Sequence, residues 1–136
     1  MNQLCASKAI IYEGDKYLLQ LRDNNPEIPC PNQWSFFGGS LDKNELPWEG
    51  LQRELNEELE WCPEEGVFLF QCILSPKTNY INNFYSIPFV DNQQKLILHE
   101  GQNMDWFSCQ EVKLCPQMAS HVLKIITRFE HKYKEC

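Results

Sequence analysis

The stretch of residues 39–61 reads GSLDKNELPWEGLQRELNEELEW. Its second half places Glu54, Glu57 and Glu58 beside Arg53 on a predicted helix. Residues three and four apart lie side by side on a helix, so Glu54 neighbours both other glutamates. Carboxylates that converge on one side repel each other unless a cation joins them, and sites built only from oxygen suit Mg²⁺ or Mn²⁺. The stretch therefore predicts a divalent metal site.

A solvated acidic face is the ordinary alternative, because clustered Glu and Arg on a helix usually point into water. The residues around the cluster favour the metal site. Gly38 and Gly39, just upstream, leave room for the backbone to come close to the same metal or to a phosphate. The spacing is G-x5-E-x7-R-E-U-x-E-E, with U an aliphatic residue, and it is filled by Gly39, Glu45, Arg53, Glu54, Leu55, Glu57 and Glu58.

This spacing resembles the Nudix box, and the chain is similar to the Nudix hydrolase family from its first hairpin to its last helix. The family pattern continues with x-G-U, where Glu60 replaces the glycine and Trp61 fills the apolar position. Since the glycine ends a helix, we expect its loss to alter the helix exit more than the chemistry. The resemblance implies an α+β fold, an α/β/α sandwich with a mixed central sheet between helices, in a single Nudix hydrolase domain over residues 1–136.

The resemblance also implies roles for the residues of the box. In Nudix enzymes the glutamates bind one or more divalent cations, so the candidate metal ligands and catalytic residues are Glu54, Glu57 and Glu58. We take Glu54 as the base that helps to deprotonate the attacking water. The carbonyl of Gly38 would complete the metal shell. Glu45 and Arg53 would support the site as an ion pair that holds the loop to the helix.

A second match lies outside the box. Residues 98–108, LHEGQNMDWFS, are similar to the E-G-Q…W-x-S segment of MutT-type Nudix enzymes, in which the glutamate reaches the metal site from a loop. Glu100 is therefore a further candidate ligand or base. The alternative is a solvated loop glutamate.

Substrate recognition is predicted by fewer residues than the metal site. Arg22 ends a predicted strand and is placed to meet a phosphate, although an ordinary surface arginine is the alternative. Gly39 allows the backbone to approach a phosphate. Phe37 is one of several aromatic residues that could stack on a base, but aromatic residues at these spacings usually belong to the core. MutT-type enzymes that prefer oxidised guanine nucleotides have an asparagine near the start of the last helix, where this chain has Ala119, and this departure disfavours that substrate.

Hydrophobic periodicity predicts the elements around the box. A hairpin joins strands at residues 4–12 and 16–22, and a loop over 23–33 leads to a short strand at 34–37. The helix of the box spans 47–60, with a buried stripe of Trp48, Leu51, Leu55 and Leu59. Further strands are expected at 67–75, 80–90, 96–98 and 105–108. Pro116 opens the last helix, with Val122, Ile125, Ile126 and Phe129 as its apolar stripe.

Length and composition narrow the class of protein. A chain of 136 residues suffices for one domain, and a net charge of −7 without a basic patch argues against nucleic acid as a partner. The seven cysteines show no metal-ligand spacing, the N-terminus lacks the apolar run of a signal peptide, and no stretch is long enough to span a membrane. We expect a cytoplasmic protein with a small-molecule nucleotide as its partner and no membrane association; a homodimer stays open.

The resemblance implies an Mg²⁺- or Mn²⁺-dependent pyrophosphohydrolase. Its substrate would be a nucleoside diphosphate linked to a group X, with a (d)NTP favoured, cleaved to a nucleoside monophosphate and pyrophosphate. A nucleotide-sugar or dinucleotide hydrolase is one alternative. A non-catalytic nucleotide-sensing module is another, but a module without turnover has no need for the complete set of glutamates.

Overall fold

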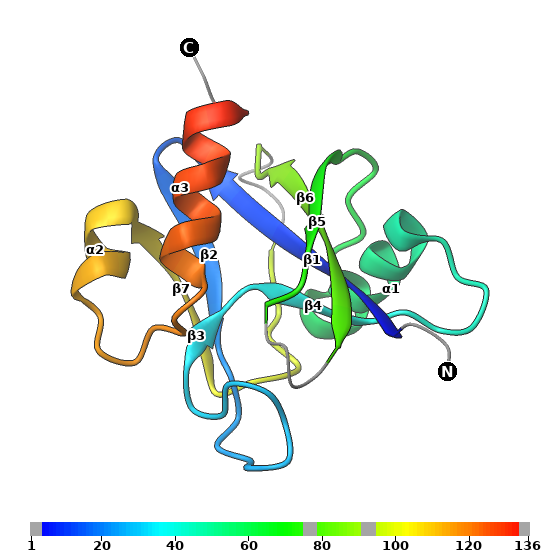
Figure 1. The fold of residues 1–136 in the computed structure, drawn as a ribbon, viewed down its shortest axis with the longest axis horizontal. Coiled ribbons are helices and arrows are strands. Elements are labelled where there is room, and N and C mark those ends of the chain that lie inside the picture. Colours follow the sequence, from blue (N-terminus) through cyan, green and yellow to red (C-terminus); the bar gives the residue numbers. More distant parts are fainter. Residues whose placement is uncertain (1–3, 75–78, 91–94, 134–136) are drawn as a thin grey trace.

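The first strand, β1 (Leu4–Glu13), forms the centre of a mixed β-sheet in the computed structural model, which describes residues 4–74, 79–90 and 95–133. Helices lie on both sides of this sheet (Figure 1). The other strands are β2 (Lys16–Leu21), β3 (Trp34–Ser35), β4 (Phe37–Ser40), β5 (Val67–Cys72), β6 (Tyr80–Pro88) and β7 (Asn103–Ser108). The helices are α1 (Pro47–Leu59), α2 (Cys109–Leu114) and α3 (Val122–Lys132).

The two edges of β1 pair with different strands. On one edge β1 runs parallel to β6, which in turn pairs antiparallel with β5. On the other edge β4 pairs antiparallel with residues 6–9, and β2 pairs antiparallel with residues 11–13. The later part of β2 pairs with β3 instead, and β7 covers its other edge. The sheet therefore forks between β4 and the end of β2.

The layers follow from the alternation of side chains along β1. Ile10 joins the core cluster under α3, while Ile11 joins the cluster under α1, because successive residues of a strand face opposite sides. The predicted stripe of α1 is buried at Leu51, Leu55 and Leu59, and the predicted stripe of α3 is buried along its length. The α+β class with a mixed sheet between helices is confirmed. No helix in the described ranges has the length and apolar character needed to cross a membrane.

The C-terminal part differs from the prediction. The sequence predicts a last helix from Pro116, but α3 begins at Val122 and residues 109–114 form the separate helix α2. The first turn of α2 is closed by a capping box. In it the Glu111 N–H donates to Ser108 Oγ at 3.1 Å, and the Ser108 N–H donates to Glu111 Oε1 at 2.8 Å. The short S-x-x-E signal therefore starts a helix upstream of the proline.

Residues 96–98, predicted as a strand, form none. Their backbone lies along the end of α1, where the Ile97 N–H donates to the Leu59 carbonyl at 3.1 Å. The last carbonyls of a helix have no partner within it, so this segment hydrogen-bonds to α1 rather than to the sheet. The strand predicted at 67–75 ends at Cys72, and Ser75 lies outside the described residues.

Candidate active site

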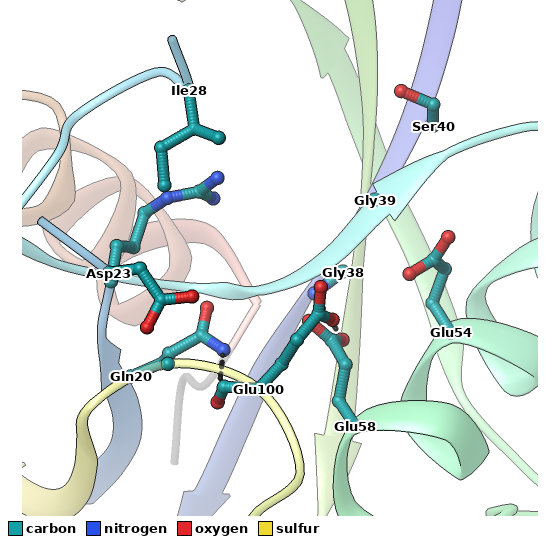
Figure 2. Close-up of a pocket in the computed structure, with 11 residues that line it drawn as sticks. Gln20, Asp23, Ile28, Gly38, Gly39, Ser40, Glu54, Glu58 and Glu100 are labelled. Carbon is teal, nitrogen blue, oxygen red and sulfur yellow. Dashed lines mark hydrogen bonds between the residues drawn. The ribbon is translucent and has the colours of Figure 1, made fainter. Parts of the chain in front are cut away.

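A cleft of about 280 Å³ opens at the fork of the sheet. The end of β2 and the loop after it form one wall, and β4 with α1 forms the other (Figure 2). The cleft brings together most of the residues predicted to form the site, including Arg22, Gly38, Gly39, Glu54, Glu58 and Glu100.

The centre of the cleft is acidic. Glu54 and Glu58 lie one turn apart on α1, and Glu100 reaches them from the segment between β6 and β7 (Figure 2). Each of these residues offers one carboxylate oxygen within 4.8 Å of the others. The structure also fixes the backbone of Glu100, because Gln20 Nε2 donates to its carbonyl oxygen at 3.0 Å.

The electrostatics of this cluster oppose ionisation. Burial raises the pKa of Glu58 to about 8, and the negative charges of Glu100 and Glu54 act in the same direction, while Lys8 and the Gly38 N–H oppose them. Burial also raises the pKa of Glu54, although the adjacent Arg53 works against this rise. Clustered carboxylates of raised pKa take up a proton or a cation. Their oxygen donors fit a hard divalent cation better than zinc.

Two glycines of β4 allow this arrangement. Gly38 has a φ of +136°, and a Cβ atom there would overlap the Ser7 carbonyl across the strand pair. Its N–H donates to Glu58 Oε1 at 3.2 Å. At Gly39 a Cβ atom would lie 2.6 Å from the carboxyl carbon of Glu54. A side chain at either position would displace a group of the cleft or the strand beside it.

An ion pair joins the loop before α1 to the helix. Arg53 Nε and Nη2 donate to the two carboxylate oxygens of Glu45 at 2.7 and 2.9 Å, and Nη2 also donates to the Ser40 carbonyl at 3.1 Å. The hydrogen bonds from Arg53 lower the pKa of Glu45 to about 2. Arg53 Nη1 donates to Glu54 Oε1 at 3.0 Å, so the same guanidinium orients a residue of the acidic cluster.

Two of the residues predicted to bind metal or substrate lie apart from the cleft. The Glu57 side chain is 57% exposed, and its carboxylate is 3.4 Å from Arg53 Nη1 rather than in the acidic cluster. The Phe37 side chain is fully buried in the core cluster under α1, with Leu51 and Leu55. Its burial there is incompatible with stacking on a base, because its ring is enclosed by core residues.

The remaining predicted residue, Arg22, lines the cleft. Its Nε atom is buried and has no hydrogen-bond partner among the described residues. A buried guanidinium nitrogen without a partner is costly, which makes an anionic ligand a suitable partner for it.

Three further residues at the site were not identified from the sequence. Gln20 is buried beside Glu100. The sequence signal that could have identified it is its polar side chain on the face of β2 opposite the apolar stripe. Lys8 lies opposite Gly38 in a strand that is otherwise mostly apolar; burial and then Arg22 lower its pKa. His121 contacts Ser35 Oγ at 3.2 Å just before α3. No local pattern marks His121, because its neighbours come from β1 and β3.

Comparisons with known proteins agree with this geometry. The NUDIX domain family model matches residues 3–129. The chain is similar in structure to the MutT protein from Methanosarcina mazei Go1, with a TM-score of 0.83, 20% identity and coverage of 97% of this chain and 96% of that one. For the MutT NUDIX hydrolase from Burkholderia pseudomallei the TM-score is 0.72, at 21% identity, with 92% and 95% covered.

The NUDIX domain of Shewanella oneidensis NrtR, solved as a complex with ADP ribose, gives a TM-score of 0.78 at 20% identity and covers 97% of this chain and 89% of that one. No curated protein matches the sequence. Structural likeness at these identities shows the fold, while the family match over residues 3–129 shows the family. The chain therefore belongs to the NUDIX domain family and is a Nudix hydrolase, an enzyme that acts on phosphoric anhydride bonds.

Proposed function

We propose that this protein is a pyrophosphohydrolase dependent on Mg²⁺ or Mn²⁺. It hydrolyses a nucleoside diphosphate linked to a group X to a nucleoside monophosphate and phosphate-X. With a (d)NTP, the leading substrate class, the second product is pyrophosphate. The observation that carries the proposal is the convergence of Glu54, Glu58 and Glu100, with carboxylate oxygens within 4.8 Å of each other. A diphosphate linkage resists hydrolysis because its own negative charge repels nucleophiles. A cation held by these residues would neutralise phosphate charge and acidify a bound water.

The glutamates of α1 have different proposed roles. Glu54 is the proposed base, since its raised pKa suits proton uptake and Arg53 holds its carboxylate at 3.0 Å. Glu58 is a proposed ligand at the buried end of the cluster. Glu57 is proposed as a further ligand, because its exposed side chain can rotate away from the 3.4 Å contact with Arg53. The Gly38 carbonyl is the proposed backbone ligand.

Arg22 and Gly39 are the proposed phosphate-binding residues. Arg22 offers a guanidinium whose Nε lacks a partner in the described residues, and charge-assisted hydrogen bonds to phosphate would supply one. Gly39 exposes backbone on the cleft wall beside Glu54, where a phosphate can approach without meeting a side chain. We do not assign Phe37 to the substrate, because its ring is buried in the core.

The test is product release from a panel of substrates with Mg²⁺ or Mn²⁺. The panel holds the dNTPs and NTPs, a nucleotide sugar, a dinucleotide and ADP-ribose, which is included because the NrtR domain was solved with it. Formation of a nucleoside monophosphate that requires the cation and is lost in Glu58→Gln supports the proposal. Tight nucleotide binding with no turnover on any member would overturn it in favour of a sensing module.

A further inference from the structure

The segment between β6 and β7 carries Glu100 into the cleft. We name residues 97–102 the bridging segment. On its α1 side, the Ile97 N–H donates to the Leu59 carbonyl at 3.1 Å and the His99 N–H donates to the Glu58 carbonyl at 2.8 Å. These carbonyls belong to the last turn of α1 and have no acceptor role within the helix. The segment is therefore attached to the helix that supplies Glu54 and Glu58.

On its β2 side the bridging segment is attached by two glutamines. Gln20 Nε2 donates to the Glu100 carbonyl at 3.0 Å. The Gln102 N–H donates to the Leu21 carbonyl, and its side chain donates to the Arg22 carbonyl, each at 2.8 Å. These bonds fix the backbone of the segment. They leave the carboxylate of Glu100, which is exposed, to be oriented by its neighbours.

One side-chain contact lies immediately beside Glu100. His99 Nε2 pairs with Glu60 Oε2, and Glu60 directly follows α1. Glu60 has φ 54° and ψ 42°, the left-handed conformation, which glycine adopts far more readily than glutamate. The pair is about half exposed, at 49% for His99 and 52% for Glu60, so it adds little to global stability. Neither backbone preference nor global stability therefore accounts for a glutamate at position 60. Its contact with His99 does.

We propose that Glu60 and His99 are positioning residues that hold Glu100 against the end of α1. Their contact joins the bridging segment to the helix one residue before Glu100 and two residues after Glu58. It thereby keeps the carboxylates of Glu54, Glu58 and Glu100 within reach of one cation. This inference rests on the proposed function, because the cluster needs a cation for Glu100 to act on.

The test measures Mn²⁺ binding to the full chain by electron paramagnetic resonance, without any substrate. In Glu60→Gly and His99→Ala we expect about 10-fold weaker Mn²⁺ binding, the lower end of the range for residues that orient metal ligands. Glu60→Gln keeps an oxygen that accepts from His99 and should bind Mn²⁺ within about 2-fold of the wild type. Glu49→Gln removes an exposed charge from the other end of α1 and serves as the control for net charge.

Two further measurements distinguish a positioning role of Glu60 and His99 from a purely structural one. Glu60→Gly should unfold at the same temperature as the wild type or higher, because glycine suits the left-handed position. Loss of Mn²⁺ affinity with unchanged or raised thermal stability cannot come from general unfolding. In a Glu100→Gln background, His99→Ala should cause no further loss of Mn²⁺ affinity, because its effect passes through Glu100.

Three outcomes of these measurements would overturn the positioning role of Glu60 and His99. Equal Mn²⁺ affinity of the wild type, Glu60→Gly and His99→Ala overturns it and leaves the proposed function standing. An equal loss from His99→Ala with and without Glu100 also overturns it, since the histidine then acts elsewhere. A wild-type chain that binds no Mn²⁺ and hydrolyses no member of the substrate panel overturns both.

Discussion

Glu58 is the residue at which function and stability oppose each other most directly. Glu58 is 3% exposed and lies beside Glu54 and Glu100, which raises its pKa. The hydrogen bond from the Gly38 N–H offsets only part of this rise. In the absence of a cation, the folded protein therefore favours the protonated acid. A buried group with a strongly perturbed pKa in a cleft is typical of a functional site.

Glu58→Gln should stabilise the metal-free protein at alkaline pH while removing activity. The folded-state pKa of about 8 lies above the ordinary value of 4.5, so Glu58 stabilises the fold fully below pH 4.5 and loses this contribution as the pH rises through 8. Glutamine has no charge to lose, and its amide oxygen can still accept from Gly38. In EDTA, we expect a melting temperature raised by about 3 °C or more at pH 9, and little difference at pH 5. An equal decrease at both pH values would contradict this.

The two glycines of β4 should respond differently to alanine. At Gly39 the new Cβ meets the end of the flexible Glu54 side chain at 2.6 Å, so the fold survives and the carboxylate moves. At Gly38 it meets backbone and requires a positive φ, so the strand pair itself must shift. We expect Gly39→Ala to lower kcat about 10-fold with a nearly unchanged melting temperature, and Gly38→Ala to destabilise the fold by roughly 3 kcal/mol. Thermal melts with kinetics on the same samples separate the two; equal destabilisation would contradict the assignment.

At the scale of elements, the loop before α1 depends on Arg53. The guanidinium binds both oxygens of Glu45 and the Ser40 carbonyl, and a lysine cannot reproduce this fork. We expect Arg53→Lys to lower the free energy of unfolding by about 1 kcal/mol, and to lower kcat because Glu54 loses its 3.0 Å partner. Urea unfolding and kinetics measure both. A lysine variant that matches the wild type in each would show that charge alone suffices.

The elements were predictable where their signals are local. Pro47 and the leucine stripe predict α1 to within one residue of its end at Leu59. The capping box of Ser108 and Glu111 is also a local signal. The prediction misses it because Pro116, a common first residue of a helix, is the predicted helix start instead. The conformation of residues 96–98 could not have been predicted from their own apolar pattern, because the Ile97 N–H bonds to the Leu59 carbonyl of α1, far away in the sequence.

At the scale of the whole molecule, the site depends on the fork of the sheet. The sequence predicts that Glu54 and Glu58 share a helix face, and the resemblance supplies Glu100, but their convergence depends on how β2 and β4 diverge from β1. The same non-local pairing brings Lys8 and His121 near the cleft and buries Phe37. Spacing along the chain carries no signal for such contacts, so the fold class was more predictable than the full set of residues around the site.

His121 should make the whole molecule sensitive to acid, because it lies where α3 meets the sheet. Its ring contacts Ser35 Oγ at 3.2 Å and lies 6.0 Å from the ring of Phe36. Burial lowers its pKa to about 4, and the positive charges of Lys8 and Arg22 act in the same direction. The ordinary value is 6.5, so the neutral ring stabilises the fold fully above pH 6.5, and this contribution is lost as the pH falls through 4.

His121→Gln tests this assignment, since glutamine keeps a polar partner for Ser35 and takes up no proton. We expect the wild type to lose about 3 kcal/mol more than the variant between pH 7 and pH 4, at roughly 1.4 kcal/mol for each unit of pKa shift. Comparing the two proteins cancels the opposite trend of Glu58, whose protonation stabilises the metal-free fold over part of the same range. Urea unfolding in EDTA at both pH values measures the difference. Parallel losses in the two proteins would place the acid sensitivity at another residue and leave His121 a packing contact between α3 and the sheet.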